Sequence, residues 1–411
     1  MMVHKKRQAC RACGGTRFQV VLALGEIPLA NSFLKGPEDF ENEKFYPLDL
    51  YFCENCSLLQ LLDVIHPEVL FRDYIYVTGT SETMAAHNIE YADSVIRFCE
   101  LEPHNAVFEI ASNDGSLLNC FQSRGLRTLG IEPAGNISRI AREKGVETVT
   151  EFFDSSCARK ILEFYGPARV VIANNVLAHV DDTQDFLKGC HDLLSNDGAL
   201  VIEVPYLREL LQNLEYDTIY HEHLCYFSVT ALMRLFETVN LGIIRIDFVP
   251  VHGGSIRVFA SRNRKHSNAV VEISGEEKQL GLTQFQTYQS FAKSVEQNRK
   301  ELRELLERLR SEQKRVAAYG APAKGNTLLN YCNIGTDLIS YTVDKSPLKV
   351  GLFTPGKHLP VRSVDTLAQD RPDYVLLLAW NYAKEVLNNQ QEYRSKGGRF
   401  VLPIPRPEVI E

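Results

Sequence analysis

Residues 104–121 read HNAVFEIASNDGSLLNCF, and this stretch decides the fold of the chain around it. Phe108 and Ile110 belong to an apolar run that is typical of a buried strand, and a helix follows from Leu117 onward. Between them lies a turn of small polar residues that ends in Gly115. A strand, a tight turn and a helix N-terminus in this order are the start of a nucleotide-binding α/β unit.

Three later stretches continue the alternation of strands and helices. The second strand, RTLGIEP (127–133), ends in Glu132, where a carboxylate can accept hydrogen bonds from both hydroxyls of a ribose. Further strands are expected in ARVVIANNVLAHV (168–180) and NDGALVIEVP (196–205). The sequence therefore predicts a Rossmann-like domain that binds its ligand at the strand ends.

The first turn distinguishes between two classes of cofactor. Dinucleotide folds use G-x-G-x-x-G, whereas this turn reads A-S-N-D-G and matches only at Gly115. The acids Glu109 and Asp114 suit a cationic ligand such as S-adenosylmethionine, although an α/β domain without a cofactor is the alternative. The expected cofactor-binding residues are Glu109, Ala111, Ser112, Asn113, Asp114, Gly115, Leu117, Glu132, Pro133, Asn174 and Asn175.

Two CxxC pairs lie within the first sixty residues and predict a metal site. Two such knuckles allow four thiolates to surround a zinc ion as a tetrahedron, and a closed site of this kind is structural. A redox pair or a chance occurrence is the alternative. The expected ligands are Cys10, Cys13, Cys53 and Cys56.

Length and charge limit the number of domains and the kinds of partner that the chain can have. The chain has 411 residues, which predicts two or three domains. Its 45 Lys and Arg against 52 Asp and Glu give a net charge of −7, and no basic run offers a footprint for nucleic acid. Because neither a membrane-spanning stretch nor a signal peptide is evident, we expect a cytoplasmic protein that binds neither nucleic acid nor a membrane. The sequence leaves the oligomeric state open.

Residues 220–227, YHEHLCYF, gather one tyrosine, one glutamate and two histidines in four consecutive positions. Such side chains suit general acid–base chemistry. A metal pair is disfavoured, because H-E-H-L lacks the histidine spacing of H-E-x-x-H. His179, which follows an apolar strand, is as consistent with simple packing as with function.

Taken together, these motifs resemble the S-adenosylmethionine-dependent sugar C-methyltransferases that act on nucleotide-linked 4-keto-deoxyhexoses, such as the 3-C-methyltransferase of tetronitrose formation. The similarity spans nearly the whole chain. It rests on the CxxC pairs and on YVTGTS (76–81), EIASNDGSLL (109–118), GIEPAGN (130–136), NNVLAHV (174–180), YHEHLCYFS (220–228), HGGSIRV (252–258) and GAPAKGNTLLN (320–330).

The resemblance implies three units, of which one binds zinc and two have an α/β fold. A small N-terminal zinc-binding module (1–70) precedes a class I methyltransferase Rossmann-like domain (71–245), and a C-terminal second Rossmann-like domain (246–411) binds the nucleotide sugar. The expected substrate is therefore a nucleotide-linked keto-deoxysugar. The expected substrate-binding residues are Tyr74, Tyr76, Lys324, Asn326, Asp344, Trp380 and Asn381.

The chemistry of such an enzyme assigns roles to the YHEH cluster. A carbon next to a ketone becomes nucleophilic only after it loses a proton, so the enzyme needs a base and a group that stabilises the enolate oxygen. We expect His223 to be the base and C-3 to be the methylated carbon. We expect Tyr220 and Glu222 to orient His223 or to hold the sugar, and His179 to handle a proton or bind the enolate.

The C-terminal hundred residues repeat the pattern of strand, glycine turn and helix around Gly320, where a diphosphate could bind at a helix N-terminus. A purely structural second fold is the alternative. The charge-rich stretch 280–314 predicts a solvated spacer helix.

Two other functions stay open. An O- or N-methyltransferase acting on a sugar nucleotide or another small metabolite would need only a base near a hydroxyl or an amine. A non-catalytic, zinc-stabilised sugar-nucleotide-binding protein is the second alternative. The YHEH cluster argues against the latter, because a binding protein has no use for a general base.

Overall fold

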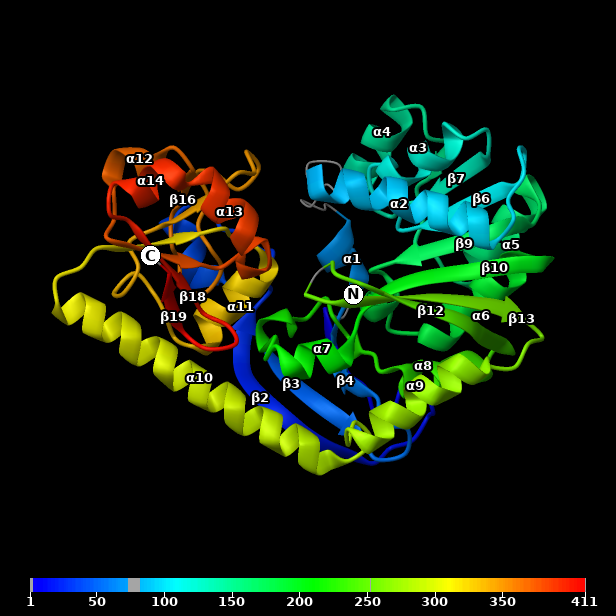
Figure 1. Cartoon of the computed structure of the whole chain (residues 1–411), viewed down its shortest axis with the longest axis horizontal. Coiled ribbons are helices and arrows are strands. Elements are labelled where there is room, and N and C mark those ends of the chain that lie inside the picture. The colour runs from blue at the N-terminus through cyan, green and yellow to red at the C-terminus, as the bar shows by residue number, and fades with distance from the viewer. Residues whose placement is uncertain (1–2, 73–81, 252, 411) are drawn as a thin grey trace.

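The computed structural model describes residues 3–72, 82–251 and 253–410 of the chain. Tyr74 and Tyr76 lie outside the described residues. Figure 1 shows a methyltransferase-like unit on the right, a C-terminal unit on the left, and the N-terminal strands beneath and between them. Where the structure describes the chain, no helix is long and apolar enough to cross a membrane.

The largest sheet in the described part of the chain has five parallel strands and an antiparallel pair at one edge. Its order is β12-β13-β10-β9-β6-β7-β8, and β13 runs antiparallel to both of its neighbours. The strand order reverses beside β6, which places a ligand crevice at the carboxyl ends of β6 and β9. The strands are β6 (Ala106–Ile110), β7 (Arg127–Ile131), β8 (Thr148–Val149), β9 (Ala168–Asn174), β10 (Leu194–Pro205), β12 (Leu241–Val249) and β13 (Ser255–Arg262).

Helices cover both faces of this sheet, because every residue of β6 is buried and successive side chains point to opposite sides. Val107 packs with Tyr91 and Phe121 on one face, while Phe108 packs with Ile161 on the other. The helices of this unit are α2 (Glu82–Phe98), α3 (Ser116–Gln122), α4 (Gly135–Glu143), α5 (Ser155–Tyr165), α6 (Thr183–Leu193), α7 (Leu207–Gln212) and α8 (Val229–Glu237).

The boundary expected after residue 245 falls inside β12. Residues of β13 pair with β12 on one side and with β10 on the other, from Ser255 to Ser261, so the sheet continues to Arg262. Ile256 and Val258 are buried in its core. The sheet therefore continues beyond residue 245, as far as Arg262.

The N-terminal module is a small antiparallel sheet with the described order β11-β4-β3-β2. Its edge strand β11 (Cys225–Tyr226) comes from the methyltransferase unit, so the module pairs directly with the YHEH segment. A second, two-stranded ladder joins the start of the module to the chain after β4. The remaining elements are β1 (His4–Lys6), β2 (Phe18–Pro28), η1 (Pro37–Asn42), β3 (Phe45–Cys53), β4 (Leu59–Leu61), β5 (Asp63–Ile65) and α1 (Pro67–Phe71).

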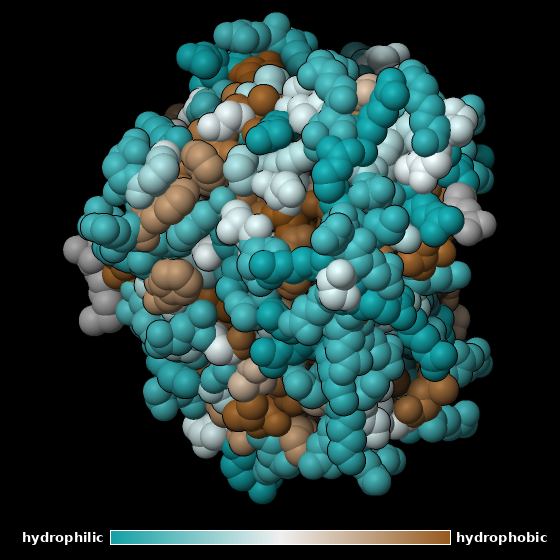
Figure 2. All heavy atoms as spheres, turned by 90° about the vertical axis from the view of Figure 1, so that its left-hand side faces the viewer, coloured by the Kyte–Doolittle hydropathy of each residue, from teal (hydrophilic) through white to brown (hydrophobic). Residues whose placement is uncertain are grey.

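The C-terminal unit contains a second, mostly parallel sheet in the described order β16-β15-β14-β17-β18-β19, which reverses direction of growth at β14. The face of the molecule in Figure 2 is mainly hydrophilic, with separate hydrophobic patches. The elements are β14 (Val316–Tyr319), α11 (Ala323–Tyr331), β15 (Thr342–Asp344), β16 (Val361–Ser363), α12 (Thr366–Asp370), β17 (Tyr374–Leu377), η5 (Trp380–Tyr382), α13 (Ala383–Asn389), α14 (Gln391–Ser395), β18 (Arg399–Leu402) and β19 (Glu408–Ile410). The predicted second Rossmann-like unit is present.

The charge-rich stretch forms α10 (Phe285–Ser311), preceded by α9 (Asn268–Gln279). The prediction of a solvated helix is wrong for one face, because Tyr288, Val295 and Leu302 are buried there at helical spacing. In Figure 1 this helix runs along the lower edge of the molecule from α9 to the C-terminal unit. α10 therefore packs against the units that it connects.

A buried ion pair fixes α2 over the strand ends. Glu203 of β10 accepts hydrogen bonds from Arg257 of β13 at 2.8 Å, and it pairs with Nε2 of His87 in α2 at 2.9 Å. Burial by itself would raise the pKa of Glu203, but His87 and Arg257 outweigh burial and lower that pKa. Tyr91, whose ring lies 4.0 Å from the Arg257 guanidinium, extends this network to Asn174, donating to its side-chain oxygen at 3.1 Å.

Replacing Glu203 with alanine is expected to lower the free energy of unfolding by about 3–5 kcal/mol, because Arg257 would stay buried without its counter-charge. The lowered pKa means that the Glu203 contribution is present at neutral pH and is lost as the pH falls through the folded-state pKa. Urea unfolding at several pH values measures both effects. The matched control is Glu143→Ala, which removes an exposed pair with Arg139 and should cost less than about 1 kcal/mol. Equal stability of Glu203→Ala and wild type at pH 7 would contradict this account.

Candidate active site

The turn after β6 has an unusual backbone that opens the cofactor crevice. Ala111, Asn113 and Gly115 have φ values of 54°, 50° and 73°, all in the left-handed region. A Cβ atom at Gly115 would lie 2.8 Å from Val146, so this position requires glycine. The strained residues cluster at one short turn, which is typical of a binding site.

The chemistry of this crevice fits S-adenosylmethionine. In the described residues, Oε2 of Glu109 and Oγ of Ser112 are buried without hydrogen-bond partners. Burial, reinforced by the neighbouring carboxylates of Asp114 and Glu132, raises the pKa of Glu109 well above its usual range. Buried acceptors and convergent acids are what a ligand with a positive charge and several donor groups would satisfy.

Glu132 lies at the end of β7, where the sequence predicts a ribose-binding acid. Its two carboxylate oxygens accept hydrogen bonds from the backbone N–H groups of Asn113 at 3.0 Å and Ala134 at 2.9 Å. Each oxygen can accept a further donor, so the side chain is held in place and still able to bind both hydroxyls of a ribose. Pro133 follows it directly.

Other expected cofactor residues make structural contacts. The carboxylate of Asp114 is fully buried and pairs with Nζ of Lys144 at 2.5 Å. Leu117 packs in the core beneath α3. Asn174 accepts from Tyr91, and the backbone N–H of Asn175 donates to the Glu203 carbonyl at 2.8 Å. Both asparagines end β9 at the crevice.

The YHEH segment holds one histidine in a defined tautomer. Nδ1 of His223 lies 2.9 Å from the backbone carbonyl oxygen of Thr218, and Nε2 lies 2.8 Å from the hydroxyl oxygen of Tyr220. A carbonyl oxygen only accepts hydrogen bonds, so in the neutral ring the proton resides on Nδ1 and the lone pair on Nε2. The basic nitrogen of His223 is therefore Nε2, and the Tyr220 hydroxyl donates to it.

His179 joins this pair from the end of β9, in the short turn η3 (Leu177–His179). Its ring centroid lies 4.9 Å from that of His223, and its ring stacks on Phe71 with the centroids 5.7 Å apart. Burial lowers the pKa of His179 to about 4, so its imidazole is neutral at pH 7. The structure thus brings together Tyr220, His223 and His179 from two separate segments.

Glu222 points in a different direction. Its carboxylate accepts from the side-chain amide of Asn31 at 2.8 and 3.0 Å, and burial raises its pKa to about 7 despite the opposing charge of Lys349. Lys349 itself donates to the carbonyl oxygen of Ala321 at 2.8 Å. Glu222 therefore lies where the three units meet, and its expected role, to orient His223 or to hold the sugar, stays a prediction.

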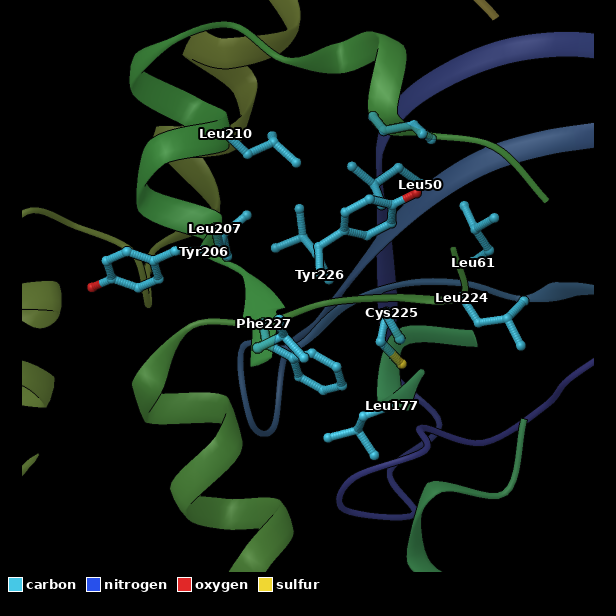
Figure 3. Close-up of a cluster of buried hydrophobic side chains, with 14 of the residues drawn as sticks. Leu50, Leu61, Leu177, Tyr206, Leu207, Leu210, Leu224, Cys225, Tyr226 and Phe227 are labelled. Carbon is cyan, nitrogen blue, oxygen red and sulfur yellow. The ribbon is translucent and has the colours of Figure 1, made fainter. Parts of the chain in front are cut away.

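The second half of the segment, with its aromatic pair, is buried in the core. Figure 3 shows Tyr226 and Phe227 among apolar side chains that come from distant stretches of the chain. His221 is also buried, and its Nε2 donates to the carbonyl oxygen of Pro47 at 3.2 Å. The neighbours labelled in Figure 3 are Leu50, Leu61, Leu177, Tyr206, Leu207, Leu210, Leu224 and Cys225.

The residues expected to bind the sugar nucleotide mostly contact other units. The indole N–H of Trp380 donates to the Asp217 carboxylate at 2.6 Å, and Nζ of Lys324 lies 4.3 Å from the Trp380 ring centroid. Asn326 is buried and donates to the carbonyl oxygen of Ala30 at 2.7 Å.

Two more of these residues lie at strand ends of the C-terminal sheet. Asp344 ends β15 and accepts from the backbone N–H groups of Ala321 and Ser346 at 2.7 and 2.8 Å. Asn381 lies in η5, directly after Trp380. Direct contact of these residues with a substrate stays a prediction.

The four cysteines of the two CxxC pairs form one cluster. Their sulfur atoms all lie within 4.8 Å of one another, with 3.5 Å between Cys10 and Cys56 and 3.6 Å between Cys13 and Cys53. These separations suit a tetrahedron with zinc–sulfur bonds of about 2.3 Å. The side chain of Gln60 donates to the Cys10 sulfur at 3.0 Å, as an outer-shell partner of a metal ligand does.

Ion pairs and a hydrogen bond connect the first zinc knuckle to the loop after His179. Arg11, which lies inside the first knuckle and is only 2% exposed, pairs with Asp181 at 3.1 Å. Arg7 pairs with the same carboxylate at 3.0 Å, and the hydroxyl of Thr183 donates to the Arg11 carbonyl at 3.2 Å. The zinc module therefore contacts both histidine-bearing segments. It contacts the loop after His179 directly, and it contacts the YHEH segment through the pairing of β4 with β11.

The sheet order, the crevice and the adjoining tyrosine–histidine pair define a class I methyltransferase. Three family models match the chain in succession: "Putative zinc binding domain" at 10–71, "Methyltransferase domain" at 84–246, and "C-methyltransferase C-terminal domain" at 250–405. The chain is 39% identical over 404 residues to the C-methyltransferase NovU of Streptomyces niveus, covering 98% of this chain and 96% of that protein. The chain belongs to the C-methyltransferase family, with S-adenosylmethionine and zinc as its cofactors.

Solved structures give weaker similarities. The magnesium protoporphyrin IX methyltransferase of Synechocystis PCC 6803 is 14% identical, with a TM-score of 0.34 over 44% of this chain and 82% of that one. An S-adenosylmethionine-dependent methyltransferase of Clostridium acetobutylicum is 12% identical, with a TM-score of 0.36 over 44% and 92%. Scores this low carry no argument about the present chain.

Replacing Cys56 with serine is expected to abolish stoichiometric zinc binding and to lower the melting temperature, because the metal would lose one of four ligands. Metal analysis should find one zinc ion per chain in the freshly purified wild-type protein. Cys120→Ser, at a half-buried cysteine outside the cluster, is the matched control and should keep its zinc. Absence of zinc from the wild-type protein would refute the site.

Replacing Glu132 with alanine is expected to weaken S-adenosylmethionine binding by roughly 10- to 100-fold, because two charge-assisted hydrogen bonds worth about 1.5–3 kcal/mol are lost. Titration calorimetry measures the affinity. S-adenosylhomocysteine carries the same ribose and should be weakened equally. Unchanged binding of either ligand would remove Glu132 from the ribose site.

Proposed function

We propose that this C-methyltransferase removes the proton next to the ketone of a nucleotide-linked 4-keto-deoxysugar and methylates the resulting enolate at C-3. The observation that carries the proposal is the pairing of His223 with Tyr220 at 2.8 Å, next to the neutral imidazole of His179. Carbon methylation next to a ketone needs both a base and a group for the enolate oxygen, whereas O- or N-methylation needs only a base.

The cofactor is expected in the crevice between β6 and β9. Glu109, Ser112 and Glu132 offer acceptors to it, while the left-handed turn at Asn113 keeps the backbone close. Bound S-adenosylmethionine supplies an electrophilic methyl group. Asn174 and Asn175 lie at the neighbouring strand end, on the side of the crevice that leads to His179.

In this proposal His223 takes the sugar proton on Nε2. The Thr218 carbonyl keeps the other proton on Nδ1, so the imidazole is already in the required tautomer before the substrate binds. Tyr220 donates to Nε2 in the structure. The substrate carbon therefore takes the place of the Tyr220 hydroxyl at Nε2, and that hydroxyl turns to the sugar.

His179 is suited to the enolate oxygen. Because burial lowers its pKa to about 4, it stays neutral and keeps one N–H to donate. A neutral ring also does not repel the positive charge that His223 acquires when it takes the proton. A neutral histidine can serve as the electrophile in this way, since the hydrogen bond strengthens as negative charge develops on the oxygen.

The C-terminal unit is expected to hold the nucleotide. Its parallel sheet reverses beside β14, and Lys324 lies in the first turn of α11, at a helix N-terminus suited to a diphosphate. Asp344 and Asn381 lie at neighbouring strand ends. This assignment rests on the resemblance to the sugar C-methyltransferases.

His223→Ala is expected to bind S-adenosylmethionine and the sugar nucleotide as the wild type does and to lose turnover by roughly 10²- to 10⁴-fold, the usual value of a positioned general base. Calorimetry gives the affinities, and NMR of the product locates the new methyl group. His104→Asn, at an exposed loop histidine, is the matched control. A methyl group on oxygen or nitrogen would show that the reaction is of the other class.

Hydrogen exchange tests the base separately from methyl transfer. With S-adenosylhomocysteine in deuterated water, the wild-type enzyme should exchange the target proton of the keto sugar, and His223→Ala should not. Exchange that persists in His223→Ala would move the base to another residue of the cluster.

A further inference from the structure

We propose that Trp380 and Asp217 form a positioning pair through which the C-terminal unit sets the orientation of the His223 imidazole. The inference rests on the proposed role of His223 as the base. It assigns the C-terminal unit a part in catalysis in addition to any part in binding the nucleotide.

The turn η4 (Tyr216–Thr218) is embedded in the C-terminal unit and in α10, although it belongs to the methyltransferase unit. Tyr216 is fully buried and donates to the side-chain oxygen of Asn298 in α10 at 2.8 Å. Its ring lies 5.6 Å from that of Tyr331 in α11. Asn298 in turn donates to the carbonyl oxygen of Pro403 at 2.8 Å. The first residue of the turn therefore cannot move without the C-terminal unit.

Asp217, the middle residue of the turn, places a carboxyl group in this interface. Its side chain is fully buried, and Oδ2 accepts the Trp380 indole N–H at 2.6 Å. Oδ1 has no hydrogen-bond partner among the residues that the structure describes. Burial raises the pKa of Asp217, while the charge of Lys324, which lies over the Trp380 ring, opposes that rise. A buried carboxylate is costly, so one long-range donor that fixes it has a large effect on the turn.

Thr218, the last residue of the turn, connects this interface to the base. Its carbonyl oxygen accepts the Nδ1–H of His223 at 2.9 Å. That carbonyl belongs to the peptide unit between Thr218 and Ile219, so its direction depends on the backbone torsion angles that link it to Asp217. Trp380 thus acts on His223 through one side chain and two successive peptide units.

The pair explains two features that a simple packing role leaves unaccounted for. An apolar residue at position 217 would fill the same space without the cost of a buried charge. A phenylalanine at position 380 would cover Lys324 as the indole does. An acceptor at position 217 together with the indole N–H adds a directional, long-range contact to the local backbone hydrogen bonds of the turn, which apolar packing would not supply.

Trp380→Phe tests the inference, because it removes the N–H and keeps an aromatic ring beside Lys324. We expect kcat to fall about 10- to 100-fold, with the KM for the sugar nucleotide and the affinity for S-adenosylmethionine unchanged. In protein labelled with ¹⁵N-histidine, the His223 signals should show Nδ1–H in the wild type and a mixture of tautomers in the variant. Asp217→Asn keeps an acceptor for the indole N–H and should retain most of the activity, whereas Asp217→Leu should behave as Trp380→Phe does.

The control is Glu385→Gln, which removes an exposed ion pair with Lys345 in the same unit and should change none of these quantities. A raised KM with unchanged kcat in Trp380→Phe would place Trp380 in the substrate site and overturn the inference, as would an unchanged His223 tautomer. If Trp380→Phe does not fold, the two Asp217 variants decide. The tautomer is measured without turnover, so failure of the proposed function would leave this readout intact and the two outcomes distinguishable.

Discussion

Four cysteine sulfurs within 4.8 Å of one another impose the constraint on which the rest of the structure depends. Four thiolates at this spacing repel one another unless a dication lies between them. The metal therefore joins the knuckle at Cys10 to the knuckle at Cys53, which orders the strands that follow. Through Arg11 the first knuckle holds Asp181, and through β4 the second holds β11. Both histidine-bearing segments thus depend on a site that takes no part in chemistry.

His223, the proposed base, lies where three units meet, and each unit contributes to the site around it. The N-terminal module binds Glu222 through Asn31, and the C-terminal unit binds Asp217 through Trp380. The methyltransferase unit supplies the cofactor crevice and His179. Buried polar contacts of this kind are directional and costly to break, so they fix the side chains more closely than apolar packing would. A base and an enolate-binding group at defined positions need that rigidity.

Local sequence patterns sufficed for much of the fold and part of the site. Alternating apolar runs located β6, β7, β9 and β10, and the CxxC spacing identified the metal ligands. Glu132 was singled out because the acid expected at a ribose follows the first turn at a characteristic distance, and its contact with the ribose stays a prediction. The pattern failed where neighbouring elements were not visible. The antiparallel return of β13 to β10, which continues the sheet beyond residue 245, is a long-range pairing, and the charges of α10 concealed the buried face of that helix.

What the sequence by itself determined is the set of groups: four cysteine ligands, an acid at the end of β7, and a tyrosine and histidine three residues apart. The tertiary structure alone decided which of these groups face one another. It paired Asp114 with Lys144, and it brought Asn326 and Trp380 within hydrogen-bond distance of Ala30 and Asp217, respectively. The tautomer of His223 likewise came from a backbone carbonyl that no side-chain pattern encodes. The physical reason is that spacing along the chain fixes only local geometry, whereas buried charges and hydrogen bonds find partners through the packing of distant elements.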